Sequence, residues 1–447
     1  MSPMGSRALT AVMCALASTA SACTVATVGE GTETSRAALA TAAAAVGAGE
    51  EAGATLACGV RFVNAATGSG STTAACRSPG QACRTIQQAV GVACPGDVVI
   101  VGAGRFVENV VIDKPLSVIG SGDGTVVFPA ASSPAPCVDS SVCGGAASSV
   151  VLVRANDVTI ADLSIDGDNP ALSSGVVVRG ADVDARNGIM TDVGGPFDGL
   201  QVHNVTVRNV YLRGIDASSG GTFVIEESRV INVSGDPQAA GIFDTEGGGV
   251  IDGNVVVDAG TGIAANRSRG TRITNNTVTR SAGGIHTDNA GLAPGSSPDV
   301  VANNVVTDCG ADGFGVWSFA PYLPATFRGN RVSRCGVGLA ELGQNAPARA
   351  VFVDNQVDGA SLPGTIGLYV TTSLFDYGSS DVRVVAARNT IANTSVGVYV
   401  DEQTGHSATV DLDCDALPGD AEAIVSGDAS VTVHDRAACT AVAEALN

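Results

Sequence analysis

The sequence predicts an all-β solenoid, because a short fragment returns along the chain, its apolar residues alternate, and turn-forming residues separate the repeats. The fragment is an asparagine with an apolar strand, followed some residues later by glycine and an aliphatic residue. Its leading asparagines are Asn254, Asn276, Asn304, Asn330, Asn355 and Asn389. A period of this length indicates units that bury their apolar faces only against their neighbours.

Within each unit the composition favours strands. Runs rich in valine, isoleucine and threonine alternate apolar and polar side chains, which is the period of a strand. Glycine, asparagine, aspartate and serine fill the gaps and permit tight turns. No segment of helical period lies between residues 98 and 430. We therefore expect a single-stranded right-handed parallel β-helix solenoid, because parallel crossovers are almost always right-handed.

The repeated asparagines have a structural interpretation. Asparagine tolerates the left-handed backbone region, and its amide can bond to the amide of the next coil. We expect these residues to hold neighbouring coils together rather than to carry chemistry.

The N-terminal region contains five segments in a recognisable order. They are Arg61–Gly68, Cys83–Val90, Pro95–Val101, Gly104–Asn109 and Leu116–Gly120. Together they resemble the opening of pectin-lyase-like right-handed β-helix proteins: a first strand, a short N-terminal capping helix, and a Pro-Gly-Asp turn into the first coil. The resemblance covers about residues 60–430 and implies the fold. It implies no single activity, because the fold hosts lyases, hydrolases, epimerases and non-catalytic surface proteins.

The catalytic motifs of two groups in that family are absent from this sequence. The Asn-Thr-Asp, Asp-Asp and Gly-His-Gly motifs of polygalacturonase-like members do not occur, nor do the Trp-Xaa-Asp-His and Arg-Xaa-Pro-Xaa-Xaa-Arg motifs of pectate-lyase-like members. No catalytic residue can be transferred from these groups. Alginate-acting members have looser motifs and stay open as relatives.

The first residues are typical of a bacterial lipoprotein secretion signal. Arg7 supplies a positive charge, and the apolar stretch Ala8–Ala17 is too short to span a membrane. Ala20-Ser21-Ala22 places small residues directly before Cys23, the expected site of lipid attachment. Simple cleavage after Ala22 is the alternative. The predicted segments are a signal (1–22), a flexible tether (23–57), an N-terminal cap (58–97), the β-helix (98–430) and a C-terminal cap (431–447).

Cysteine usage fits an exported chain with disulfides. Of the 12 cysteines, Cys14 lies in the signal and Cys23 is the lipid candidate, so an even number remains. Cys309 and Cys335 each follow a repeated asparagine by five residues, so they should stack one coil apart within disulfide reach. The other expected groups are Cys137 with Cys143, Cys414 with Cys439, and an N-terminal set of Cys58, Cys76, Cys83 and Cys94. The pairing within that set is open, and a zinc site is its alternative.

Charge argues against nucleic acid as a partner. The 447-residue chain has 44 acidic and 24 basic residues, a net charge of −20, and no basic cluster. Such a surface disfavours polyanions unless a cation assists. We expect contact with a membrane only through the lipid anchor.

Aligning the coils on their glycine–aliphatic pairs predicts which side chains share an outer face. The second and fourth residues after each glycine should point outward. The first of these columns is Asp216, Phe243, Ala264, His286, Gly315, Ala340, Tyr369 and Tyr399, and the second is Ser218, Thr245, Asn266, Asp288, Trp317, Leu342, Thr371 and Asp401. Sugar-binding grooves use this mixture of rings and polar groups. An ordinary solvated face is the alternative.

His286 and Asp288 are the candidate catalytic pair on this face. An imidazole can act as a general base at neutral pH, and the alignment places Asn266 and Trp317 beside Asp288. The expected ligand-binding residues are Asn266, Trp317, Asp216, Tyr369, Tyr399 and Asp401.

No cofactor follows with certainty, although calcium (Ca2+) has candidate ligands. Asp411, Asp413, Asp415 and Glu422 have EF-hand spacing, but Ala416 stands where that loop needs glycine. The acidic turns 166–169 and 244–246 could hold calcium, and ordinary turn chemistry explains them as well. We assign no metal site.

These observations predict an exported surface protein, anchored to a bacterial membrane or extracellular, that binds polysaccharide or serves as a scaffold. An acidic, cation-assisted polysaccharide is one form of this partner. The first alternative is a polysaccharide lyase, epimerase or glycoside hydrolase acting on acidic glycans. The second is a purely structural or adhesive surface protein.

Overall fold

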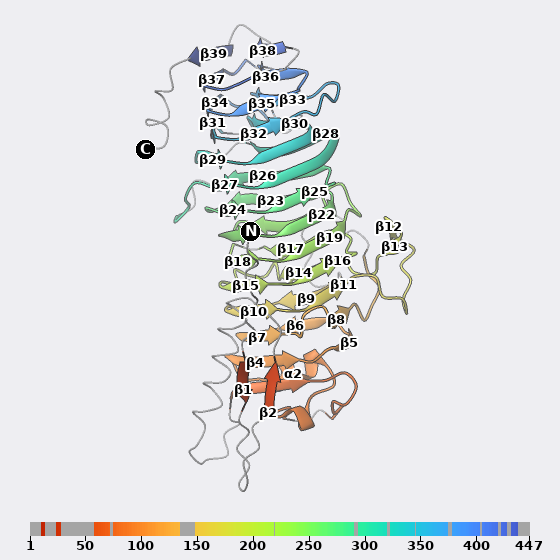
Figure 1. The fold of residues 1–447 in the computed structure, drawn as a ribbon. Coiled ribbons are helices and arrows are strands. Elements are labelled where there is room, and N and C mark those ends of the chain that lie inside the picture. Colours follow the sequence, from red (N-terminus) through yellow and green to blue (C-terminus); the bar gives the residue numbers. More distant parts are fainter. Residues whose placement is uncertain are drawn as a thin grey trace.

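The computed structural model describes most of the chain. The described residues are 10–13, 24–27, 58–71, 75–134, 148–218, 220–289, 294–319, 322–344, 346–373, 378–402, 405–418, 422–426 and 431–436. Near the N-terminus, strands β1 (Thr10–Met13) and β2 (Thr24–Thr27) pair antiparallel. Apart from the strands β12 and β13, the remaining strands stack along one axis, with β4 near one end and β39 at the other (Figure 1).

Three ladders of parallel strands form the solenoid. The first ladder contains β3 (Val60–Val63), β4 (Asp97–Val101), β7 (Leu116–Ile119), β10 (Val158–Ala161), β15 (Leu200–His203), β18 (Thr222–Glu226), β21 (Gly248–Asp252), β24 (Arg272–Thr274), β27 (Val300–Ala302), β29 (Ala325–Arg328), β31 (Ala348–Val353), β34 (Val382–Ala387), β37 (Ala408–Asp413) and β39 (Val431–Arg436).

The second and third ladders join into one sheet, because two long strands run through the corner between them. The second contains β5 (Gly104–Val107), β8 (Thr125–Phe128), β11 (Ser164–Asp166), β16 (Thr206–Arg208), β19 (Arg229–Val233), β22 (Val255–Ala259), β25 (Thr277–Thr279), the first halves of β28 (Val305–Phe319) and β30 (Arg331–Leu342), β32 (Gln356–Asp358) and β35 (Thr390–Ala392). The third contains β6 (Val110–Ile112), β9 (Ser149–Val153), β14 (Asn187–Thr191), β17 (Arg213–Ala217), β20 (Ala240–Thr245), β23 (Thr261–Ser268), β26 (Gly283–Asn289), the second halves of β28 and β30, β33 (Ile366–Thr371), β36 (Val396–Asp401) and β38 (Glu422–Ser426).

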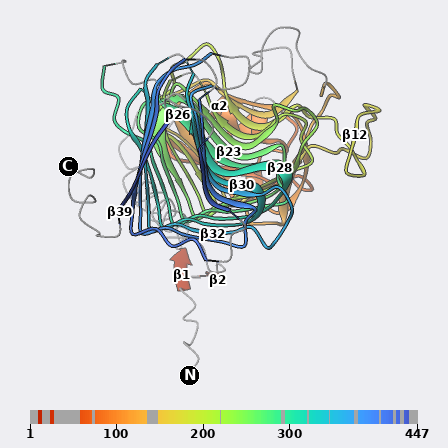
Figure 2. The same cartoon turned by 90° about the horizontal axis from the view of Figure 1, so that it is seen from above.

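The predicted parallel β-helix is therefore confirmed, but the coil is not single-stranded. A typical coil contributes one strand to each ladder, as β18, β19 and β20 do. Seen along the axis, the three ladders enclose a common interior (Figure 2). The short strands β12 (Val177–Val178) and β13 (Ala181–Asp182) form an antiparallel hairpin that projects from one side (Figure 2).

The interior is a stack of aliphatic side chains in register. In the second ladder, the inward column is Val207, Val230, Val256, Val278, Val306, Val332, Val357 and Ile391, and every member is buried. Phe327 stacks on Phe352 in the next coil, with ring centroids 4.7 Å apart. Each coil thus depends on its neighbours for burial, as expected of a solenoid.

The repeated asparagines form a continuous hydrogen-bonded ladder at one corner, as predicted. The backbone N–H and the Nδ2 of Asn276 both donate to Oδ1 of Asn304, at 2.9 and 3.0 Å. Nδ2 of Asn276 also donates to the carbonyl oxygen of Ile251, at 2.9 Å. The same pattern repeats for Asn254, Asn304, Asn330 and Asn355.

The left-handed backbone belongs to the residue before each ladder asparagine. Asn275, Asn303, Asp354 and Arg388 have φ of 58°, 57°, 56° and 54°, and glycines take this position before Asn254 and Asn330. The expectation that the ladder asparagines themselves adopt this conformation was wrong. The corner needs one left-handed residue to turn the chain and a following asparagine to bridge the coils.

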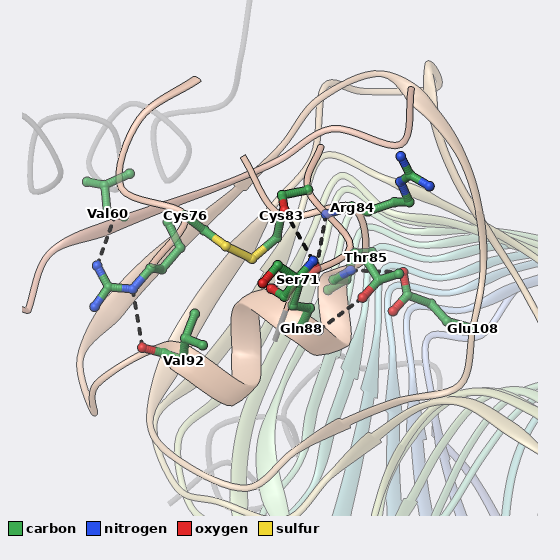
Figure 3. The surroundings of a disulfide bond; sticks show 12 residues. Val60, Ser71, Cys76, Cys83, Arg84, Thr85, Gln88, Val92 and Glu108 are labelled. Carbon is green, nitrogen blue, oxygen red and sulfur yellow. Dashed lines mark hydrogen bonds between the residues drawn. A yellow bond between two sulfur atoms is a disulfide. The ribbon is translucent and has the colours of Figure 1, made fainter. Parts of the chain in front are cut away.

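The N-terminal cap closes the first coil with the predicted helix. Helix α2 (Ile86–Val92) begins at Thr85, whose side chain accepts a hydrogen bond from the Gln88 N–H at 3.1 Å (Figure 3). The Glu108 carboxylate accepts from the Ile86 and Gln87 N–H groups at 2.9 and 2.8 Å. Both acceptors satisfy N–H groups that lack partners within a helix. The one-turn 3₁₀ helix η1 (Pro79–Gln81) precedes α2.

Disulfides hold the cap and one buried corner of the coils. Cys58 pairs with Cys94, and Cys76 pairs with Cys83 beside α2 (Figure 3), so these cysteines are not zinc ligands. The predicted Cys309–Cys335 bond is present, with Cα atoms 4.6 Å apart. Cys414 is also disulfide-bonded. Cys23, Cys137, Cys143 and Cys439 lie outside the described residues, so their predicted roles stay predictions.

Within the described part of the chain, no helix is long and apolar enough to cross a membrane.

We predict that breaking the asparagine ladder destabilises the solenoid. Asn304→Ala removes the acceptor for Asn276 and leaves buried amide groups unpaired, which costs about 2–5 kcal/mol in the free energy of unfolding. Asn303→Gly is the matched control, because glycine keeps the left-handed backbone of Asn303, and its cost should be below about 1 kcal/mol. Thermal and urea unfolding measure both. Equal losses for the two variants would contradict the ladder's role.

Candidate functional site

The outward-facing residues of the third ladder form the candidate site. In the first outward column, the residues lie in register from coil to coil, and this column is Asp216, Phe243, Ala264, His286, Trp317, Ala340, Tyr369 and Tyr399. Beside it runs a second column, in which Thr245 pairs with Asn266, and Phe319, Leu342, Thr371 and Asp401 pair in turn. Asp288 joins this column at a register shift between β23 and β26, where the Arg267 N–H donates to its carboxylate. We call these two columns together, with Arg213 and Phe314 at their margin, the outer face.

The structure corrects the predicted position of Trp317. Trp317 pairs in register with His286, so it lies beside that imidazole and not beside Asp288. Asn304 precedes Gly315 by eleven residues, whereas Asn276 precedes Gly284 by eight. The three extra residues are absorbed by two register shifts between Thr307 and Phe314, around the exposed residues 310–312.

Gly315, rather than Gly313, therefore takes the place of the repeated glycine. A Cβ atom on Gly284 would lie 2.0 Å from the carbonyl oxygen of Gly315, and one on Gly315 would lie 2.6 Å from that of Gly338. Only glycine allows the backbones of successive coils to approach this closely.

Aromatic rings gather on the outer face of a chain that has few of them. The His286 ring lies 4.6 Å from Trp317 and 5.2 Å from Phe319, between ring centroids. Two coils further on, Tyr369 and Tyr399 stack at 5.6 Å. Trp317, Phe319 and both tyrosines are half-buried, so part of each ring faces outward. Aromatic residues make up only 4% of the sequence, which makes their concentration here informative.

A buried pair of opposite charges lies at the N-terminal end of the outer face. The Arg213 guanidinium stacks over the Phe243 ring at 3.8 Å and donates to the Gln238 carbonyl oxygen. Asp216 is fully buried and accepts a hydrogen bond from the Ser218 hydroxyl. Burial raises the pKa of Asp216 to about 6, against the opposing attraction of Arg213. This carboxyl group therefore titrates near neutral pH.

His286 and Asp288 differ from the predicted base-and-acid pair. The His286 side chain is only 7% exposed, and burial, with a smaller contribution from Arg213, lowers its pKa to about 3. Neither ring nitrogen has a hydrogen-bond partner among the described residues. An imidazole of this kind stays neutral and is a weak base at pH 7. Burial raises the pKa of Asp288 to about 7, although the Arg267 N–H donates to this carboxylate.

Several buried polar atoms of this region lack hydrogen-bond partners among the described residues. They come from successive strands of the third ladder: Asn187 Oδ1, Arg213 Nε, Asp216 Oδ2, Thr245 Oγ1, Asn266 Oδ1, both ring nitrogens of His286, and Trp317 Nε1. Each such group costs about 1–3 kcal/mol, and native proteins contain few of them. Along this ladder they form a row of polar atoms that water or a polar ligand could satisfy.

A second set of carboxyl groups lies inside the coils. The sequence marked Asp244 only as part of a possible calcium-binding turn, and it did not mark Asp299 or Glu341. Asp244 accepts from Thr271 Oγ1 at 2.9 Å, and Asp299 accepts from the Thr271 N–H at 2.7 Å and the Ser268 hydroxyl at 2.6 Å. Burial raises the pKa of both carboxyl groups. In the same inward column, Glu341 is in register with Val370. An acid at a position where the next coil has valine is the feature of the sequence that could have revealed the buried carboxyl group of Glu341.

The calcium candidates take structural roles. Asp415 ends the asparagine ladder, because its Oδ1 accepts from the N–H and Nδ2 of Asn389 at 2.7 and 2.8 Å. Asp411 and Asp413 lie on strand β37 rather than in a loop. Asp166 pairs with Arg208 at 2.9 Å. In the described residues, the only three groups close enough to share a metal are Cys58, Cys94 and Asp97, and those cysteines are disulfide-bonded.

We predict that Glu341 lowers stability as the pH rises. It is fully buried beside the Ser318 hydroxyl, and burial raises its pKa to about 8. Below pH 4 both folded and unfolded forms hold the proton. Between pH 4.5 and 8 only the folded form does, so the free energy of unfolding falls over this range.

Glu341→Gln removes this proton linkage. Between pH 4 and pH 8, the free energy of unfolding of the variant should rise by about 2–4 kcal/mol relative to that of the natural chain. Thermal unfolding across that range measures the difference. A stability difference that does not change with pH would contradict the assignment.

Comparison with known proteins supports the architecture. Residues 187–357 match the family model described as a right handed beta helix region. The catalytic domain of a GH87 alpha-1,3-glucanase in complex with nigerose superposes with a TM-score of 0.59, at 15% identity over 87% of this chain and 70% of that chain. No curated protein sequence matches the chain.

Two further solved structures share the architecture. The A-module of a mannuronan C-5 epimerase of Azotobacter vinelandii gives a TM-score of 0.52, at 15% identity over 78% of this chain and 92% of that chain. A family 28 exopolygalacturonase of Yersinia enterocolitica gives 0.50, at 12% identity over 80% and 76%. At these identities the likeness establishes the fold alone. The chain therefore has the right-handed parallel β-helix fold of pectin-lyase-like proteins.

Proposed function

We propose that this protein binds a polysaccharide along its outer face. The observation that carries the proposal is the row of unpartnered polar atoms beside aromatic rings. A sugar hydroxyl both donates and accepts hydrogen bonds, so it can satisfy an amide oxygen, an indole N–H or a carboxylate. The C–H faces of a sugar pack against aromatic rings. An extended chain of sugars matches a face that repeats from coil to coil.

The half-buried residues would make the first contacts with the glycan. Thr245, Asn266 and Trp317 are partly exposed and each carries an unpartnered polar atom. Tyr369 and Tyr399 extend this row of side chains by two coils. The names of the three similar structures all refer to proteins that act on glycans, which supports a glycan as the partner.

The second candidate function is catalysis on a bound glycan. Asp216 and Asp288 have pKa values of about 6 and about 7. Carboxyl groups that titrate near pH 7 are suited to donate or accept a proton during cleavage or epimerisation of a sugar. The glucanase, the epimerase and the exopolygalacturonase favour this candidate as structural analogues.

We predict that Trp317→Ala weakens glycan binding. Loss of this ring should weaken the free energy of binding by about 1–3 kcal/mol, which raises Kd by about 5–150-fold. Calorimetry with oligosaccharides measures the change. Val177→Ala is the control, because Val177 is exposed on the β12–β13 hairpin. An unchanged Kd for Trp317→Ala would place the binding site elsewhere.

The same assay separates binding from catalysis. If the protein is an enzyme, Asp216→Asn or Asp288→Asn should abolish product formation while the variant still folds, as a cooperative thermal unfolding transition would show. If it only binds, the natural chain releases no product from any glycan that it binds.

We also propose that the protein is exported and held at a bacterial membrane through a lipid on Cys23, with residues 1–22 as the signal and 23–57 as a tether. Disulfides in the cap and at the Cys309–Cys335 corner support an oxidising compartment. Cys23→Ser should move the protein from the membrane fraction to the soluble fraction. A natural chain that is already soluble after export would contradict the anchor.

A further inference from the structure

We infer that the glycan bound at the outer face is a neutral polysaccharide rather than a polymer of uronic acids. This inference rests on the proposed function and narrows it to a substrate class. It departs from the acidic glycan considered from the sequence. Three observations carry it: the charges of the strands, the contacts of their two arginines, and the chemistry of the unpartnered atoms.

The strand segments that build the outer face carry few positive charges. They are residues 213–217, 240–245, 261–268, 283–289, 314–319, 337–342, 366–371 and 396–401. Their cationic residues are Arg213 and Arg267 alone, and they contain no lysine. Asp216, Asp288 and Asp401 lie in the outward columns. His286 adds no charge, because its pKa is about 3.

Both arginines are already engaged within the protein. Arg213 is buried, stacks on Phe243 and donates to the Gln238 carbonyl oxygen. Arg267 pairs with Glu246 at 3.1 Å, with most of its side chain in solvent. Recognition of a carboxylate normally uses an arginine fork aimed at the ligand. Arg213 keeps only a buried Nε without a partner, and Arg267 points into solvent toward Glu246, so neither guanidinium presents an open fork on the outer face.

The unpartnered atoms fit hydroxyl groups better than carboxylates. Asp216 Oδ2 needs a donor, whereas Arg213 Nε needs an acceptor, and the two residues lie on the same strand. A sugar hydroxyl can serve either atom, and neighbouring hydroxyls can serve both. A uronate carboxylate could accept from Arg213 only while facing the Asp216 carboxylate.

The half-exposed part of the outer face offers neutral partners. The side chains of Thr245, Asn266 and Trp317 are half-exposed, and their unpartnered atoms are a hydroxyl, an amide oxygen and an indole N–H, each buried just beneath the surface. A uronate placed among them would also meet Asp288 and the field of a chain with a net charge of −20. Repulsion between like charges weakens binding at each such contact, and repeated uronates would accumulate the loss.

The test is calorimetry with matched neutral and acidic ligands. The probes are glucan, mannan and xylan oligosaccharides, together with oligogalacturonate and oligomannuronate of equal length. Titrations run in EDTA at 50 and 500 mM NaCl, and are repeated with 5 mM CaCl2. We expect at least one neutral ligand to bind, with less than threefold change in Kd between the two salt concentrations. Each uronate should bind at least tenfold more weakly in EDTA.

Charge variants test the repulsion itself. Asp288→Asn should strengthen uronate binding in EDTA at 50 mM NaCl by at least threefold. Asp113→Asn makes the same charge change at a side chain that is 63% exposed near the N-terminal cap, and should have no effect. Uronates that bind more tightly than every neutral ligand, in EDTA or only with calcium, would overturn this inference and leave the proposed function standing. No binding of any glycan would overturn both.

Discussion

The rest of the structure depends on the register between successive coils, and from Asn254 to Asp415 the asparagine ladder fixes that register. Each ladder asparagine is at most 1% exposed, and its side-chain amide makes hydrogen bonds to the coils on either side. Moving one coil by a single residue would leave several buried amide groups unpaired and turn every inward valine outward. Side chains far apart in the sequence are therefore stacked predictably on each face of the solenoid.

This constraint explains how much the sequence alone could predict. The spacing of the asparagines and the alternation of valines led directly to the parallel β-helix and to the Cys309–Cys335 bond. The same spacing predicted most residues of the first outward column, since Phe243, His286, Tyr369 and Tyr399 lie in it as expected. The repeat alone did not show that three strands, rather than one, make a coil.

The failures arise where the chain departs from its own repeat. Three extra residues before Gly315 move Trp317 into the column of His286, and the rings of Trp317 and Phe319 then cover that imidazole. The resulting burial turns a predicted general base into a neutral ring. Arg213 is held by the carbonyl oxygen of Gln238, which follows the end of β19. Spacing rules cannot foresee contacts made by irregular segments of this kind.

The same face combines features that stability alone does not favour. Asp216 and His286 are buried with unpartnered polar atoms, and burial raises the pKa of Asp288 to about 7. The asparagine ladder and the stacked aliphatic core supply the rigidity that lets the fold tolerate these costs. A ligand that brings hydroxyl groups and apolar C–H faces would relieve them, which is why a glycan fits this face.

Trp317 is the only tryptophan of the chain, so its fluorescence reports on the outer face without a label. The most direct measurement is a fluorescence titration of the full protein with a neutral oligosaccharide that calorimetry shows to bind. The account predicts a saturable change in emission, reduced quenching by acrylamide, and a midpoint equal to the calorimetric Kd. A glycan that binds with that Kd while emission and quenching of Trp317 stay unchanged would contradict the assignment of the outer face.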